Sequence, residues 1–286
     1  MCRLYGSLSL KSAPATRWLV ESERSLLNQS NTSAEQAQKD GWGVGWYDAR
    51  GAAVIDKDVG GAFEPGQRDR YLSAAARATG TLVIGHLRHA SNPMGLTHEE
   101  LIGVVNSQPF GDGNLLFAHN GAIPYPRETR PCLGRFESRL KGVNDSEVLF
   151  LLLARHLDSG VDPLEAYART VADLWEVWMQ KDEPASGPYS GLNVLLAPGP
   201  DELWAFCNWH GEHGTGFLDG RPYYQMTYTA DPFEVVIGSE PFDARADDWK
   251  PIPNAGYVHA ARKGSRIELS TGWIPIRRPV NAGRVP

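Results

Sequence analysis

The chain opens with MCRLYGSLSL at residues 1–10, in which apolar and polar side chains alternate from Cys2 onward. This alternation is typical of a strand with one buried face. A small second residue permits removal of the initiator methionine, which would leave Cys2 with a thiol and a free α-amine of pKa about 8 on one residue. Such a residue holds a nucleophile beside a base. A terminal cysteine more often packs as a small apolar residue, so this hypothesis depends on the rest of the sequence.

Length, charge and cysteine count narrow the class of protein. With 286 residues, of which 42% are hydrophobic and 22% charged, the chain can bury a full core. A net charge of −6 with scattered cations argues against nucleic acid and anionic membranes as partners. The sequence has no apolar run of membrane-spanning length and no signal-peptide pattern, so we expect a cytoplasmic protein. The spacing of Cys2, Cys132 and Cys207 suggests neither a disulfide framework nor a zinc cluster.

Hydrophobic periodicity predicts an α+β fold. Strand patterns recur over ten segments: 2–10, 43–47, 81–87, 114–119, 192–196, 203–207, 223–229, 234–237, 256–260 and 266–269. Helical patterns cover 15–27, 145–157 and 163–179. Strands are followed by a helix pair and then by more strands, without βαβ alternation, which indicates sheets covered by segregated helices. We expect one domain over residues 2–270 and a C-terminal surface tail over 271–286, with a loop at 183–188.

Polar residues follow two of the predicted strands. Arg88 lies in GHLRHAS at residues 85–91, where a guanidinium could hold a carboxylate through two hydrogen bonds or could form a surface ion pair. Asn120 and Gly121 lie in FAHNGAI at residues 117–123. Asn-Gly is first of all a turn signal. The asparagine amide and the glycine N–H could also point at one spot and stabilise an oxyanion.

Two further segments have both a structural and a functional interpretation. NDSE at residues 144–147 has the composition of a helix cap, yet Asp145 there could bind an ammonium group. DGWGVG at residues 40–45 lets another group approach the backbone but lacks the glycine spacing of a nucleotide-binding loop. Trp42, Trp46 and the loop 184–189 could wall a pocket for an acceptor, although large aromatic residues more often pack in a core.

Together with Cys2, these segments resemble the class II glutamine amidotransferase domain of the N-terminal-nucleophile hydrolases, most closely stand-alone members such as the γ-glutamyl hydrolases of ergothioneine biosynthesis. The resemblance covers residues 2 to about 269. Met-Cys-Arg looks like the start of the family's nucleophile strand, and DGWG resembles its glycine-rich strand. Four further segments of this chain are similar to family motifs and occur in the same order: HLR at 86–88, HNG at 119–121, NDSE at 144–147 and VIGSEP at 236–241.

The resemblance implies a four-layer αββα sandwich, which agrees with the α+β prediction from periodicity. It implies that the Cys2 thiolate attacks the side-chain amide of glutamine or of a γ-glutamyl compound, with its α-amine relaying the proton. A γ-glutamyl-thioester would form, and water would release glutamate after ammonia or a larger amine has left. Asn120 and Gly121 would stabilise the oxyanion. No metal or organic cofactor is implied.

The resemblance also assigns the residues that hold the substrate. Arg88 would take the α-carboxylate and Asp145 the α-ammonium group. Residues His89 and Ser91 would lie near the same head group, but the synthase-linked branch has an aromatic residue and a threonine there, so these two contacts transfer less directly. Another departure is Gln108 in NSQPF at residues 106–110, where many stand-alone relatives have His-Pro-Phe.

Two alternatives to a stand-alone γ-glutamyl hydrolase stay open from the sequence. The chain contains no synthase domain, so it could be a glutaminase subunit that delivers ammonia to a separate partner synthase. It could also be a catalytically inactive subunit that binds glutamine or glutamate and regulates a partner. The presence of Cys2, Asn120 and Asp145 argues against the inactive subunit.

Overall fold

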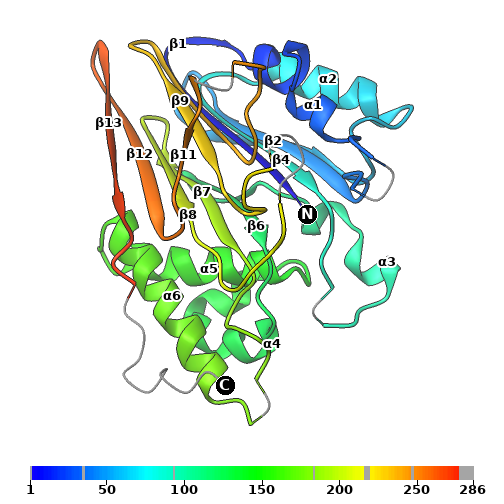
Figure 1. The fold of residues 1–286 in the computed structure, drawn as a ribbon, viewed down its shortest axis with the longest axis vertical. Coiled ribbons are helices and arrows are strands. Elements are labelled where there is room, and N and C mark those ends of the chain that lie inside the picture. The colour runs from blue at the N-terminus through cyan, green and yellow to red at the C-terminus, as the bar shows by residue number, and fades with distance from the viewer. Residues whose placement is uncertain are drawn as a thin grey trace.

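The computed structural model describes residues 2–33, 36–92, 94–182, 184–215, 220–245 and 248–276. Two antiparallel sheets lie face to face between helices (Figure 1). The seven-stranded sheet has the order β11-β9-β10-β1-β4-β2-β3, and the six-stranded sheet has the order β13-β12-β8-β7-β6-β5. This arrangement confirms the predicted α+β class.

The strands of the seven-stranded sheet are β1 (Arg3–Pro14), β2 (Gly41–Tyr47), β3 (Ala53–Asp58), β4 (Thr79–Arg88), β9 (Thr227–Ala230), β10 (Glu234–Gly238) and β11 (Lys250–Pro251). Those of the six-stranded sheet are β5 (Phe110–Asp112), β6 (Leu115–Gly121), β7 (Leu192–Gly199), β8 (Glu202–Cys207), β12 (Gly256–Lys263) and β13 (Arg266–Trp273). The α-helices are α1 (Leu26–Gln29), α2 (Gln67–Arg77), α3 (His98–Leu101), α4 (Pro126–Thr129), α5 (Asp145–Asp158) and α6 (Pro163–Met179). A π-helix, η1 (Arg17–Glu21), and two 3-10 segments, η2 (Val104–Asn106) and η3 (Arg130–Arg139), complete the described elements.

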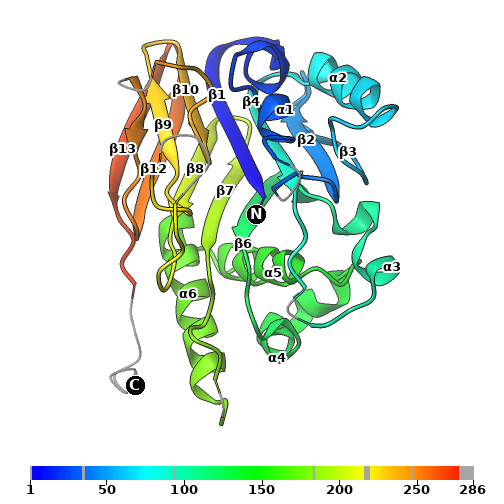
Figure 2. The same ribbon diagram turned by 45° about the vertical axis from the view of Figure 1, so that its right-hand side comes forward.

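Three hydrophobic clusters separate four layers. One lies between the sheets and contains Leu4, Leu82, Ala118 and Leu195. A second packs the outer face of the seven-stranded sheet under α1 and α2, and a third packs the six-stranded sheet against α5 and α6. Figures 1 and 2 show these helix groups at opposite ends of the molecule. The αββα sandwich is therefore confirmed.

Two predicted elements differ from the structure. The predicted helix over 15–27 is broken into η1 and α1, because Ser22 is extended and the Ser25 side chain caps a new helix by accepting from the Asn28 N–H at 3.3 Å. The predicted strand over 223–229 begins only at Thr227, since Tyr223 and Tyr224 lie in a turn. Strand β13 continues through Trp273 into the segment predicted as a tail, and residues 277–286 lie outside the described part.

The sequence analysis did not identify strand β3, strand β5 or helix α2. Strands β3 and β5 are edge strands, and α2 is a helix with a narrow buried face. Of the helices that the structure describes, none combines the length and the apolar character needed to cross a membrane.

Candidate active site

Cys2 precedes β1 in the middle of the seven-stranded sheet, with only 9% of its surface exposed. Both views place this end of β1 beside β6 of the other sheet (Figures 1 and 2). The Cys2 Sγ donates to the His89 carbonyl at 3.5 Å. Ser239, just after β10, accepts from the Leu4 N–H through its hydroxyl at 3.0 Å and donates its own N–H to the Leu4 carbonyl. The VIGSEP segment therefore holds the strand that carries Cys2.

The surroundings of Cys2 keep its thiol protonated. Burial raises the pKa of the Cys2 thiol, and the negative charge of Asp145 also raises it, whereas the Arg88 charge lowers it. Because the thiolate is the nucleophilic form, a buried thiol of raised pKa needs a base to take its proton. The charges of Arg88 and Asp145 thus both act on the Cys2 thiol, with opposite sign.

Arg88 ends β4 on the face between the sheets, on the same side as Leu82 and Ile84. Its guanidinium is 2% exposed and donates to the carbonyls of Asp40 at 3.5 Å and Leu101 at 3.1 Å. Among the described residues it forms no ion pair with a carboxylate. Two of its five N–H groups are thus used on neutral acceptors, which leaves the charge available to an anion. The carboxylate of Asp40 instead accepts the Ala90 N–H at 2.8 Å and holds the segment after β4.

Asp145 is the first residue of α5 and is 4% exposed. Its Oδ2 accepts the Ile123 N–H at 3.0 Å, and burial raises the pKa of this carboxyl to about 6. Within the described part of the chain, Asp145 takes part in no ion pair. Arg88 and Asp145 are thus buried groups of opposite charge that attract each other without forming an ion pair, and each is costly to bury alone. Such a pair suits a ligand that carries both charges.

Asn120 lies on β6 and points to the face between the sheets, the same face as Leu116 and Ala118. It is 1% exposed, its Oδ1 has no hydrogen-bond partner, and its amide forms no side-chain hydrogen bond to any described residue. Gly121 follows with φ of 149°, and a Cβ at this position would lie 1.8 Å from the Gly191 carbonyl oxygen. Only glycine fits there. The predicted Asn-Gly turn is thus the end of a strand, with a donor amide left uncommitted.

His119 lies on the opposite face of β6 and anchors α5. Its Nδ1 lies 2.9 Å from the Ser146 hydroxyl and its Nε2 lies 3.1 Å from the Gly191 carbonyl. Burial lowers the pKa of His119 to about 4, so the ring is neutral at pH 7. Since a carbonyl only accepts, Nε2 carries the proton and Nδ1 accepts from Ser146. Burial likewise lowers the pKa of His86, between the sheets, to about 3.

The NDSE segment combines helix capping with positioning of Asp145. The Asn144 Oδ1 caps α5 by accepting the Ser146 N–H at 2.9 Å, and its amide donates to the Asn106 carbonyl at 2.8 Å. The Glu147 carboxylate accepts from the N–H groups of Lys141 and Gly142. The structural interpretation is therefore confirmed for Asn144, whereas ammonium binding by Asp145 stays a prediction.

The structure places the predicted site residues differently. Arg88 and Asp145 are buried and their charges act on Cys2, and Asn120 is buried on the inner face of β6; their roles stay predictions. The His89 ring points to the Ala37 carbonyl, with Nδ1 at 3.1 Å, and contacts the site only through the His89 carbonyl. Ser91 is exposed and its hydroxyl bonds to none of the described residues.

The suggested aromatic pocket wall is wrong for the tryptophans. Trp42 and Trp46 are buried under α1 and α2, on the outer face of the sheet, and the Trp42 indole donates to Gln67 at 3.0 Å. Tyr223 and Tyr224 are the aromatic residues whose pKa values respond to the charge of Cys2. The sequence pattern predicted a strand over 223–229 that contains both tyrosines. Because tyrosine is common in strands, the pair itself gave no signal of a turn, and Pro222 before it was the one local indication.

Comparisons with known proteins agree with this geometry. Residues 1–271 match the family model of the class II glutamine amidotransferases. The γ-glutamyl-hercynylcysteine sulfoxide hydrolase of Mycolicibacterium smegmatis is 28% identical over 254 residues, which cover 84% of this chain and 87% of that protein. The protein of the same name from Mycobacterium tuberculosis is 27% identical over 277 residues, which cover 92% and 94%.

Two solved structures share the fold. A glutamine aminotransferase class-II domain protein from Silicibacter pomeroyi superimposes with a TM-score of 0.64 at 19% identity, over 96% of this chain and 99% of that one. The glutamine phosphoribosylpyrophosphate amidotransferase of B. subtilis superimposes with a TM-score of 0.61 at 17% identity. That match covers 97% of this chain but 50% of the B. subtilis protein.

Proposed function

This chain belongs to the family of class II glutamine amidotransferases, and we propose that it is an N-terminal-cysteine hydrolase of γ-glutamyl amides. Cys2 is the nucleophile after removal of Met1. The substrate is a small molecule with a free α-amino acid end and a γ-amide. The products are glutamate and the amine released from that amide.

The observation that carries this proposal is a pair of buried groups of opposite charge, Arg88 and Asp145, which both act on the Cys2 thiol and form no ion pair with each other. Arg88 is 2% exposed and Asp145 is 4% exposed, and the described residues supply neither with an ion-pair partner. An α-carboxylate on Arg88 and an α-ammonium on Asp145 would neutralise both groups at once. In the proposal, a glutamyl group bound in this way presents its side-chain carbonyl carbon to the thiol.

The chemistry proceeds in two halves. The free α-amine of Cys2 takes the proton of its own thiol, and the thiolate attacks the γ-carbonyl carbon. Asn120 Nδ2 and the Gly121 N–H stabilise the oxyanion that forms. The C–N bond then breaks, and the leaving amine takes the proton from the α-ammonium of Cys2. Water attacks the thioester with the same amine as base, which frees glutamate and restores the thiol.

The leaving amine is larger than ammonia in this proposal. Tyr223 and Tyr224 pack edge to face at 5.3 Å, and the charge of Cys2 raises the pKa of both hydroxyls in addition to burial. Aromatic rings within electrostatic reach of the thiol would provide contact area for an organic amine. The mycobacterial relatives, which the chain matches over most of their length, are named as hydrolases of a γ-glutamyl conjugate. A stand-alone hydrolase of a γ-glutamyl conjugate thus has more support than an ammonia-delivering subunit.

Steady-state hydrolysis of glutamine and of several γ-glutamyl amides tests the proposal. We expect γ-glutamyl amides of bulky amines to exceed glutamine in kcat/KM. The Cys2→Ala variant should be inactive on all of them, whereas the Cys132→Ala variant, which removes a half-buried cysteine, should keep wild-type rates.

Three results would contradict the proposal. An active Cys2→Ala variant would exclude Cys2 as the nucleophile. Glutamate binding without turnover of any amide would indicate an inactive regulatory subunit. Equal, weak rates on all amides would indicate a glutaminase that lacks its partner synthase.

A further inference from the structure

Gln108 makes an unusual contact with the strand that carries Asn120. Gln108 is 2% exposed, its Nε2 donates to the His119 carbonyl at 3.2 Å, and its Oε1 accepts the His119 N–H at 2.6 Å. One side-chain amide thus satisfies both backbone groups of the residue before Asn120.

The contact replaces a missing part of the strand ladder. β5 pairs with β6 from Phe110 opposite Phe117, so continuing the same register would set residue 108 opposite His119. Pro109 lies between and has no N–H to donate. Because the Gln108 side chain carries a donor and an acceptor at its tip, it takes over the hydrogen bonds that a backbone pair would make there.

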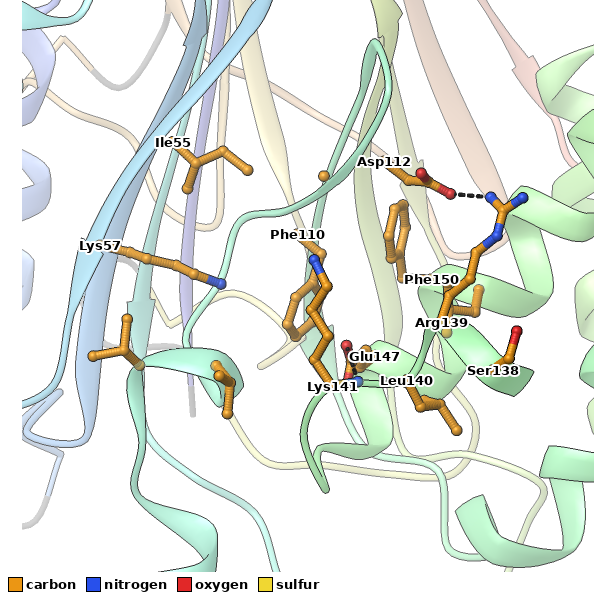
Figure 3. Close-up of a pocket in the computed structure, with 14 residues that line it drawn as sticks. Ile55, Lys57, Phe110, Asp112, Ser138, Arg139, Leu140, Lys141, Glu147 and Phe150 are labelled. Atoms are coloured by element: carbon orange, nitrogen blue, oxygen red, sulfur yellow. Dashed lines mark hydrogen bonds and ion pairs between the residues drawn. The ribbon is translucent and has the colours of Figure 1, made fainter. Parts of the chain in front are cut away.

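The other sheet holds Gln108 in place. Lys57 of β3 donates through Nζ to the carbonyls of Ser107 at 2.5 Å and Pro109 at 3.4 Å, on either side of Gln108. A Cβ on Gly43 of β2 would lie 2.2 Å from the Gln108 carbonyl oxygen. Figure 3 shows Lys57 reaching from β3 toward Phe110 along a cavity of about 620 Å³. The segment 107–109 therefore connects the sheet that carries Arg88 to the strand that carries Asn120.

We propose that Gln108 is a positioning residue that sets the oxyanion-binding groups of β6 relative to Cys2. The inference rests on the proposed function, in which Asn120 and Gly121 stabilise the oxyanion. Since no side-chain hydrogen bond to a described residue holds the Asn120 amide, its position depends directly on the backbone of β6. An error of about 1 Å in such a position is enough to lower a reaction rate a hundredfold.

Two variants of similar size separate the hydrogen bonds from the packing. Gln108→Met fills the same space without either hydrogen bond. Gln108→Glu accepts from the His119 N–H when ionised but regains the donor to the His119 carbonyl only when protonated. The matched control is Gln29→Met, which removes a buried amide that donates to the Arg24 carbonyl at 2.8 Å under the outer face of the seven-stranded sheet.

Kinetics on a γ-glutamyl amide between about pH 5 and pH 7 give the readout. We expect Gln108→Met to lower kcat roughly 10- to 100-fold with KM within about threefold of wild type, because the ground-state clamp of Arg88 and Asp145 is untouched. The ratio of the Gln108→Glu kcat to the wild-type kcat should rise as the pH falls. His86 and His119 stay neutral over this range, since burial lowers their pKa values to about 3 and about 4.

The proposal is overturned by a Gln108→Met variant that keeps wild-type kcat, or by losses that Gln29→Met reproduces. If Gln108→Met does not fold, a pH-independent ratio for Gln108→Glu overturns it equally. Failure of the proposed function has a different signature, because wild-type protein would then hydrolyse no γ-glutamyl amide or the Cys2→Ala variant would stay active.

Discussion

Replacement of Asp145 by asparagine is expected to give a more stable protein that has lost its activity. Burial raises the pKa of Asp145 from 3.8 to about 6. Ionising this carboxyl at pH 7 therefore costs more free energy in the folded, ligand-free protein than in the unfolded chain. At about 1.4 kcal/mol per pH unit, that cost amounts to roughly 3 kcal/mol. Asparagine is uncharged and can still accept the Ile123 N–H, so it removes the cost and keeps the contact.

The pH dependence of the stability difference follows from the direction of the pKa change. A carboxyl whose folded pKa lies above its unfolded pKa favours folding below about pH 3.8, and that contribution is lost as the pH rises through about 6. The stability gain of Asp145→Asn should therefore be near zero at pH 4 and complete by pH 7. A gain of that size corresponds to a rise in Tm of about 5–10 °C.

Thermal unfolding at pH 4, 5.5 and 7, together with kcat/KM at pH 7, measures both effects. Loss of the buried charge that meets the ammonium group should lower kcat/KM at least about 30-fold. The control is Asp58→Asn, because Asp58 is a buried carboxylate already paired with Arg70, and its replacement should destabilise the fold. An Asp145→Asn variant that is less stable than wild type at pH 7, or equally stabilised at pH 4 and 7, would refute this reasoning.

Three further predictions concern the other groups of the site. Asn120→Ala should lower kcat about 10²- to 10³-fold with little change in KM, measured by steady-state kinetics, because it removes one oxyanion donor; an unchanged kcat would exclude that role. Arg88→Lys should weaken binding of glutamate, measured by titration calorimetry, since an ammonium cannot form the two parallel hydrogen bonds of a guanidinium; wild-type affinity would show that no carboxylate binds there. A glutamine-like electrophile should label Cys2 and not Cys207, as mapped by peptide mass spectrometry, because burial raises the pKa of the Cys207 thiol to about 12; labelling of Cys207 first would place the reactive thiol elsewhere.

The sequence predicted the elements whose pattern is strong. Helix α6 has the predicted bounds, Pro163 to Met179, because a capping Asp162, an early proline and a regular apolar stripe all agree. The strands that carry Arg88 and Asn120 were also predicted, since both are apolar runs that end abruptly in polar residues. The edge strand β3 and the helix α2 were not predicted, because their apolar faces are narrow.

The contacts that hold the site together could not be predicted from the sequence. The Gln108 side chain pairs with His119, and Asn106 joins the site by donating to the Leu101 carbonyl that Arg88 also contacts. Nothing in local sequence distinguishes these buried amides from exposed ones, since their partners belong to other elements. Trp42 and Trp46 were wrongly expected at a pocket for a different reason. The register of a strand decides which of its two faces meets the helices, and the sequence of β2 does not show that register.

The decisive test of Cys2 as the nucleophile is mass spectrometry of the acid-quenched protein during turnover of a γ-glutamyl amide. We expect a mature chain that begins at Cys2 and carries a γ-glutamyl group on that residue as a thioester, which disappears when substrate is exhausted. Active protein that retains Met1, or a γ-glutamyl group found on any residue other than Cys2, would contradict it.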